Sequence, residues 1–86
     1  MLQRNEPKPS RNNICAVVVT YHPDIKLRER IEQIRYQVDK LLIIDNNSES
    51  DCIEMIQRIS KDLDVDVILN ESNLGVAEAL NQGFKY

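Results

Sequence analysis

Apolar residues in this chain form three short runs, and the first two are continuous rather than alternating. Residues 14–20 are apolar up to Thr20 and rich in β-branched residues, whereas a strand covered on only one face would alternate. This run therefore predicts a central strand of a parallel sheet, buried on both faces. A second continuous run predicts a strand over residues 41–45, and a third strand is expected over residues 65–70.

Between and after these runs, apolar residues recur at spacings of three and four, which places them on one stripe of a helix. The first helix is expected to be capped by Asp24, and the second by Ser48 or Ser50. A third helix is expected from Val76 to about Phe84. The stripes of the first two helices are Leu27, Ile31, Ile34 and Val38, and Cys52, Met55, Ile56, Ile59 and Leu63.

The order strand, helix, strand, helix, strand, helix with short connections indicates right-handed crossovers and a parallel sheet with helices on both faces. The sequence thus predicts an α/β protein of three layers, α/β/α, which is half of a doubly wound nucleotide-binding fold with strand order 3-2-1. Residues 1–13 have no apolar pattern to bury and are interpreted as a flexible leader, so the predicted domain covers residues 14–86.

Composition narrows the class of protein. A chain of 86 residues makes one small domain, and 11 basic against 14 acidic residues give a net charge of −3. A protein that binds nucleic acid by covering phosphates would have a basic excess, so that class is disfavoured. No apolar run is long enough to cross a bilayer, and the opening residues do not form a signal peptide. Cys15 and Cys52 form no CxxC pair and are interpreted as small core residues of a reduced, cytoplasmic protein.

Hydrogen-bonding residues end all three predicted strands: Thr20, Asp45 and Asn70. The carboxyl ends of parallel strands share one edge of the sheet, which is where open α/β sheets bind ligands. At that edge Asp45 can accept a hydrogen bond from the ring N–H of a pyrimidine, and the aromatic face of Tyr21 can stack on the base. The turn at residues 73–75 precedes a helix, whose free N–H groups favour phosphate. Together these residues predict a nucleotide pocket.

Each of these residues also has a plainer structural interpretation. Asp45 can accept hydrogen bonds from the N–H groups of its own turn at residues 46–48. Tyr21 can pack on the first helix, and Asn73 and Gly75 can serve only as the turn that leads into the third helix. Nucleotide contact and the structural role of Asp45 are compatible with each other.

Other features point away from familiar sites. The sequence contains neither the GxGxxG of dinucleotide-binding proteins nor a P-loop. The acidic pair Asp64 and Asp66 spells DxD but lies at the start of the third strand, at the opposite end from Asp45, so it is interpreted as solvated carboxylates and not as a metal site. His22, the only histidine, is interpreted as a loop residue at the pocket rim, and Gly83 as a helix terminator.

Three segments, each at the end of a predicted strand, form a combination of motifs that resembles a known family. They read VVVTYHPD at residues 17–24, LIIDNNS at residues 42–48, and NESNLGVA at residues 70–77 followed by LNQG at residues 80–83. Together they resemble the family 2 glycosyltransferases, and among these the bacterial rhamnosyltransferases. The resemblance implies a GT-A fold and an inverting transfer of a hexosyl group from a nucleotide sugar, such as dTDP-rhamnose, to a glycan or lipid-linked acceptor. It also implies a location in the cytoplasm, including the inner face of the membrane.

The resemblance further assigns donor contacts to this chain. Asp45 would accept from the base N3–H, and the other contacts would lie along the base, ribose and diphosphate. A Mg²⁺ or Mn²⁺ ion held by a later DxD motif and a later carboxylate base would complete the enzyme, so no catalytic residue is expected here and the chain alone is expected to be inactive. The implied donor-binding residues are Thr20, Tyr21, Asp45, Asn73, Gly75 and Asn81.

A rival interpretation comes from a different class of protein. The same fold would suit a non-catalytic nucleotide-binding or protein-interaction module whose exposed sheet edge pairs with a partner. Open edges recruit strands and small domains bury little surface, so we expect marginal stability or a homo-oligomer formed through that edge.

Overall fold

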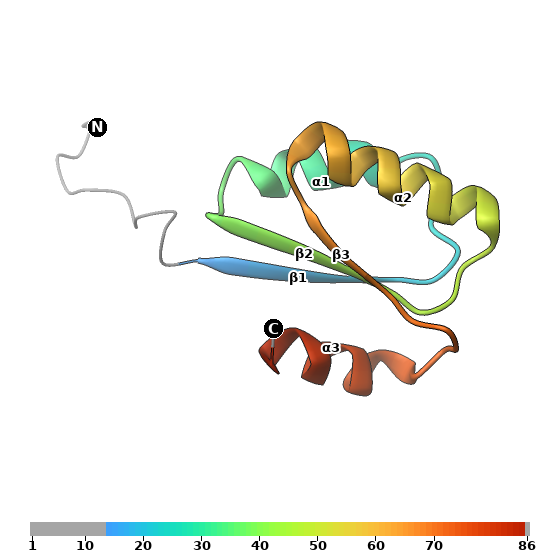
Figure 1. The fold of residues 1–86 in the computed structure, drawn as a ribbon. Helices are drawn as coiled ribbons and strands as arrows, with labels where there is room; N and C mark the ends of the chain where they lie inside the picture. The colour runs from blue at the N-terminus through green and yellow to red at the C-terminus, as the bar shows by residue number, and fades with distance from the viewer. Residues whose placement is uncertain (1–13, 86) are drawn as a thin grey trace, which may run out of the picture.

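The computed structural model describes residues 14–85, which form a three-stranded sheet between two layers of helix (Figure 1). Two helices, α1 and α2, lie on one face of the sheet, and α3 lies on the other. The predicted α/β class and the three-layer arrangement are therefore confirmed, whereas the predicted leader, residues 1–13, lies outside the described residues. In chain order the elements are β1 (Cys15–Thr20), α1 (Leu27–Arg35), β2 (Lys40–Asp45), α2 (Ser50–Leu63), β3 (Asp66–Leu69) and α3 (Gly75–Lys85).

All strand pairs are parallel, and the order across the sheet is β1-β2-β3, as predicted. The register pairs Thr20 with Asp45, and Asp45 with Leu69. The three strands therefore end side by side. Figure 1 shows the loops after all three strands leaving from this same end of the sheet.

The prediction that the first strand is central was wrong for the part of the chain described here. β2 is the central strand and is almost wholly buried, whereas β1 is an edge strand with half-buried apolar residues. Its first residue, Cys15, is exposed, so the prediction of a core cysteine fails there. Cys52 is half-buried, and its Sγ donates to the carbonyl oxygen of Pro23 at 3.6 Å. An apolar run predicts covered faces, but it does not specify how many neighbours pair with its backbone.

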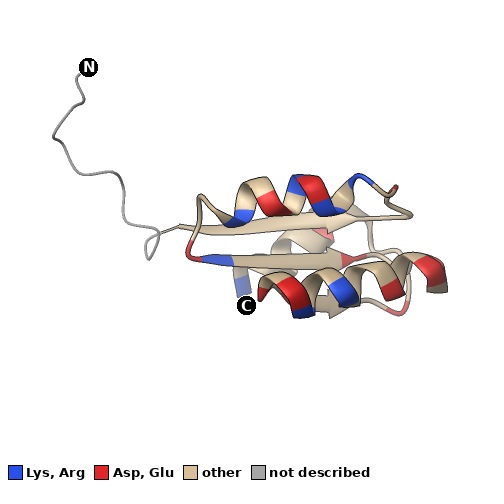
Figure 2. Cartoon of the chain, turned by 90° about the horizontal axis from the view of Figure 1, so that it is seen from above, with Lys and Arg blue, Asp and Glu red and all other residues tan. Residues whose placement is uncertain are grey.

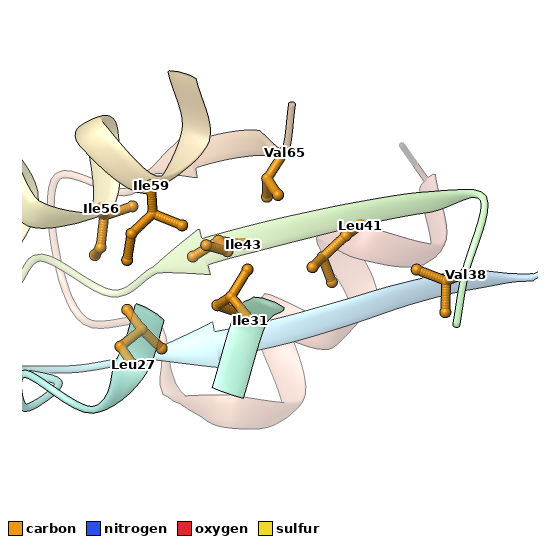
Figure 3. Close-up of a cluster of buried hydrophobic side chains, with 8 residues drawn as sticks. All are labelled: Leu27, Ile31, Val38, Leu41, Ile43, Ile56, Ile59 and Val65. Carbon is orange, nitrogen blue, oxygen red and sulfur yellow. The ribbon is translucent and has the colours of Figure 1, made fainter. Parts of the chain in front are cut away.

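The main core fills the space between the sheet and helices α1 and α2 (Figure 3). Burying each of these Leu, Ile and Val side chains contributes about 1.5–3 kcal/mol relative to leaving it in water. The core therefore supplies most of the favourable free energy of folding of a domain this small. Its buried members come from both helices and the sheet: Leu27, Ile31, Val38, Leu41, Ile43, Ile56, Ile59 and Val65.

Helix α1 is shorter than its stripe suggested, since it ends at Arg35 and not near Val38. The Arg35 guanidinium donates to the backbone carbonyls of Val38 at 3.0 Å and Asp39 at 3.2 Å, and to that of Leu63 at 3.1 Å. A basic side chain in the last turn thus binds carbonyls that follow the helix. Val38 still packs in the core although it lies beyond the helix.

The predicted side-chain caps were also wrong. Helix α1 has Lys26 at its N-cap, and Asp24 instead accepts a hydrogen bond from the Lys26 N–H at 2.9 Å in the preceding turn. Helix α2 has Glu49 at its N-cap with no side-chain cap bond, and Ser50 is already its first helical residue. Ser48 binds Asp45 instead of a helix end.

The face of the sheet under α3 carries a smaller core, centred on Leu42, Ile44 and Ala79. Gly83 lies inside α3 and does not terminate it, which corrects the sequence prediction. A Cβ built on Gly83 would come within 2.9 Å of both Cγ atoms of Val17 in β1. This glycine therefore allows the helix to lie close against the strand.

Charged residues of both signs are interspersed along α1 and α2 (Figure 2). Neither of these two helices therefore carries charge of one sign only, and the whole chain has a net charge of −3. None of the helices within residues 14–85 combines the length and the apolarity that a bilayer crossing requires.

Candidate functional site

Backbone hydrogen bonds extend the sheet by one step beyond its carboxyl edge. The Asn46 N–H donates to the carbonyl of Thr20 at 2.9 Å, and the Asn70 N–H donates to the carbonyl of Asp45 at 2.9 Å. The polar residues that follow each strand therefore start from fixed backbone positions and not from loose loops.

Asp45 is the buried centre of this edge, with 0% of its surface exposed. Its Oδ1 accepts hydrogen bonds from the Thr20 hydroxyl at 2.7 Å and from the Ser48 hydroxyl at 2.6 Å. Its Oδ2 accepts one, from the Ser48 N–H at 2.7 Å. A buried carboxylate is tolerated when several donors compensate its lost hydration. The structural role predicted for Asp45 in its own turn is thus present, and its contact with a nucleotide stays a prediction.

The loop after β1 is tied to the loop after β2. The His22 N–H donates to the Ser48 Oγ at 2.6 Å, and the Glu49 N–H donates to the His22 Nδ1 at 3.2 Å. The Tyr21 ring lies 4.1 Å from the His22 ring, centre to centre, and the side chain is 54% exposed. His22 therefore lies at the rim of this edge, as predicted, and Tyr21 keeps a solvent-exposed ring surface beside it.

The side chain of Asn46 joins the end of β2 to the start of α3. It is 2% exposed, and its Nδ2 donates to the carbonyl of Gly75 at 3.3 Å. Its Oδ1 accepts from the Asn70 Nδ2 at 2.9 Å and from the Leu74 N–H at 3.5 Å. Through these bonds the turn at residues 73–75 lies at the same edge as Thr20 and Asp45, so the predicted convergence is confirmed.

Asn70 continues this amide network into the middle of α3. Its Nδ2 donates to the Gln82 Oε1 at 2.9 Å, and the Gln82 Nε2 donates back to the Asn70 Oδ1 at 3.0 Å. Asn70 was predicted as a strand end, whereas the hydrogen bonds that Asn46, Ser48 and Gln82 make around this edge were not predicted. The turn residues were signalled by their place after β2, whereas nothing local signals Gln82, which lies 12 residues from its partner.

Left-handed backbone conformations concentrate at this edge. His22 has φ of 52°, Asn47 has 71° and Gly75 has 83°, and only Asp64, with 57°, lies elsewhere among the described residues. A non-glycine residue in this region costs about 1–2 kcal/mol, and such strain clusters at functional sites. The hydrogen bonds around Asp45 and Asn46 offset that cost.

The turn that leads into α3 is built by Asn73 and Gly75. The Gly75 N–H donates to the Asn73 Oδ1 at 2.8 Å, so the structural role predicted for these two residues is present. Apart from its chain neighbours and the backbone of its own helix, no described heavy atom lies within 4 Å of the position that a Cβ on Gly75 would occupy. The amino end of α3 therefore faces open space.

Residues 15–86 match the family described as Glycosyl transferase family 2. The chain belongs to this family. It is similar to the protein named dTDP-rhamnosyl transferase RfbF from Shigella flexneri, with 33% identity over 76 residues. That alignment covers 87% of this chain and 25% of the relative, so the chain spans about a quarter of the relative's length. No solved structure matches the chain significantly.

One predicted donor contact of this family 2 chain is not brought to the edge. Asn81 is an exposed residue of α3, six positions beyond Gly75, which is about 9 Å along a helix axis. Its side chain makes no hydrogen bond with the other described residues. A helix that returns across the sheet carries its later residues away from the carboxyl edge, and a sequence motif does not show that direction.

The literal DxD lies at the amino edge of the sheet, as predicted. Asp66 is the first residue of β3, paired with Leu42 near the start of β2, and Asp64 is the C-cap residue that follows α2. Within residues 14–85 no group of three or more acidic, histidine or cysteine side chains is placed to hold a metal ion.

Cys52, which lies beside the site, has a pKa that is raised above the ordinary value for cysteine. Partial burial raises the pKa of the Cys52 thiol, and the carboxylates of Glu49, Asp45 and Asp51 raise the pKa further. This thiol therefore stays protonated to higher pH than an ordinary cysteine and is a poor nucleophile.

Proposed function

We propose that this chain forms the nucleotide-sugar-binding part of an inverting glycosyltransferase that takes dTDP-rhamnose or a similar donor. Its acceptor would be a glycan or a lipid-linked glycan in the cytoplasm, including the inner face of the membrane. The observation that carries the proposal is the convergence of Thr20, Asp45 and the turn at residues 73–75 at one edge of a parallel sheet. Family membership and the similarity to the Shigella flexneri protein support the choice of donor.

The base would bind between Tyr21 and Asp45. The exposed Tyr21 ring offers a stacking surface, and the Asp45 Oδ2 accepts one hydrogen bond and has capacity for another. Asp45 is buried, so a pyrimidine N3–H reaches it only after the covering residues move. We propose that the loop of Tyr21 and His22, which two hydrogen bonds hold to the loop after β2, moves on binding.

The diphosphate would bind at the amino end of α3. The first turn of this 11-residue helix has unpaired N–H groups and the positive end of the helix dipole. The open space at Gly75 lets a ligand approach the backbone there. Asn81 lies about two turns away, so it is omitted from the proposed contacts.

A divalent metal, Mg²⁺ or Mn²⁺, would neutralise the leaving diphosphate, and a carboxylate base would activate the acceptor hydroxyl. The described residues do not fit this metal, because their DxD sequences, which overlap within residues 62–66, lie at the end of α2 and the start of β3, at the amino edge. Both groups are therefore assigned to the remainder of a full-length enzyme, and the 86 residues alone are expected to bind the donor without transferring the sugar.

Titration of the purified chain with dTDP and with UDP, followed by calorimetry or ¹H–¹⁵N NMR, tests this proposal. Tyr21→Ala should weaken binding about 2- to 10-fold, the worth of one aromatic contact. Tyr36→Ala is the matched control, since Tyr36 is also an exposed tyrosine but follows α1 at the opposite edge. A folded chain that binds neither nucleotide would refute the proposal.

A second function is favoured by one observation: β1 pairs only with β2, so its outer edge is unpaired among the described strands. The six residues of β1 carry no charge that would discourage pairing. A non-catalytic interaction module would use this edge to recruit a partner strand, including that of a second copy. Light scattering that shows a defined dimer, together with no nucleotide binding, would favour this function over the first.

A further inference from the structure

Asn46 is a buried neutral side chain whose hydrogen-bond partners all lie on other segments of the chain. Only 2% of its surface is exposed, although it directly follows β2 at the carboxyl edge. Its carboxamide is bonded on both sides, with Nδ2 donating to the Gly75 carbonyl and Oδ1 accepting from Leu74 and Asn70. Both polar atoms of the side chain are thus occupied by bonds within the protein.

These bonds connect two consecutive residues at the start of α3 to Asn46, the residue that follows β2. The Leu74 N–H and the Gly75 carbonyl flank the peptide unit at which the helix begins, and one carboxamide holds both. An amide alone among small side chains presents a donor and an acceptor on one planar group. Asn46 therefore ties the amino end of α3 directly to the residue that follows Asp45.

We propose that Asn46 is a positioning residue for the diphosphate of the donor, acting through residues 74 and 75 without touching the ligand. The inference rests on the proposed function, because it assumes that the diphosphate binds at the amino end of α3. Asn46 aligns the free N–H groups of the first turn with the base-binding residues, so that one nucleotide can reach both. Misplacement of a binding group by about 1 Å is enough to weaken a multidentate contact strongly.

If Asn46 had a purely structural role, the expected effect of its substitution on ligand binding would be different. The reciprocal Asn70–Gln82 pair also ties α3 to the sheet, but it does so seven residues after the helix starts. If the network only holds the helix down, loss of either end should have the same consequences for binding. If Asn46 positions the diphosphate site, only its own loss should affect the phosphate-bearing part of the ligand.

The test compares dTDP with thymidine, which lacks the diphosphate, on the 86-residue chain by ¹H–¹⁵N NMR titration. Asn46→Ala should weaken dTDP binding about 10-fold, the worth of one to two net hydrogen bonds, and leave thymidine binding within about twofold. Asn46→Ser stays neutral, so it adds no second buried carboxylate beside Asp45, but its shorter side chain cannot bind residues 74 and 75 together, so it should give a loss of the same kind. This second variant serves if the alanine variant does not fold.

Gln82→Ala is the matched control, because it breaks two hydrogen bonds of the same network and leaves those of Asn46 to residues 74 and 75. Its melting temperature should fall, while the ratio of dTDP to thymidine affinity should stay within about twofold of wild type. A folded Asn46 variant that loses both ligands equally, or neither, overturns the inference alone. Failure of the wild-type chain to bind either ligand overturns the proposed function, and the inference with it.

Discussion

The two ends of the sheet differ in whether their acidic and amide side chains are buried or exposed. At the carboxyl edge, Asp45 and Asn46 are buried, and each is hydrogen-bonded to another segment of the chain. At the amino edge, a single guanidinium, that of Arg35, binds three carbonyls, while the acidic side chains around it are exposed. Burying polar groups is costly unless they are satisfied, so the carboxyl edge is the end where the fold maintains a defined polar geometry. This contrast supports the choice of the carboxyl edge as the ligand-binding end.

The largest expected effect comes from removing the buried carboxylate. Asp45→Ala leaves the Thr20 hydroxyl and the N–H and hydroxyl of Ser48 without their acceptor, so it should lower the free energy of unfolding by about 3 kcal/mol. Asp62→Ala is the counterpart near the amino edge, where a half-exposed ion pair with Arg28 is worth at most about 1 kcal/mol. Urea unfolding followed by circular dichroism measures both. Equal losses would break the comparison between the two edges.

A smaller effect is expected where α3 crosses β1. Gly83→Ala gains about 1 kcal/mol of helix propensity but overpacks against Val17, at a cost of about 1–3 kcal/mol, so a net destabilisation is expected. Val17 is β-branched and has little freedom to move aside. Thermal unfolding of both single variants and of the double variant with Val17→Ala gives the coupling. The double variant should lose less than the sum of the two, and simple additivity would contradict the close packing of α3 on β1.

The smallest effect concerns chemistry and not stability. Cys15, at the amino end of β1, is exposed, whereas Cys52, beside the carboxyl edge, is half-buried with a raised pKa. The thiolate is the reactive form, so a raised pKa lowers its fraction at a given pH. Alkylation of Cys52 should therefore be slower than that of Cys15, and its rate should rise at higher pH than for N-acetylcysteine. Mass spectrometry of Cys15→Ser and Cys52→Ser chains gives each rate, and a faster Cys52 would contradict the burial of this thiol.

Local patterns predicted the elements well and their ends less well. The stripe from Leu27 to Val38 located α1 and all its core residues, yet the helix ends at Arg35 because that side chain binds the carbonyls that follow it. Asp24 belongs to a residue type that is common at N-caps. Its side chain instead accepts a hydrogen bond from the Lys26 N–H, in the turn before α1, and Lys26 is the N-cap residue. Gly83 was read as a terminator, whereas its role depends on a strand 66 residues earlier in the chain, which no local pattern encodes.

By itself, the sequence determined the alternation of strands and helices, the parallel sheet and the meeting of three strand ends, because those follow from short-range periodicity and chain direction. Only the tertiary structure decided which polar residues at that edge are buried and which partners they bind. The physical reason is that a hydrogen bond between distant segments depends on how helices pack on the sheet. That packing is a property of the folded chain as a whole, and no single motif carries it.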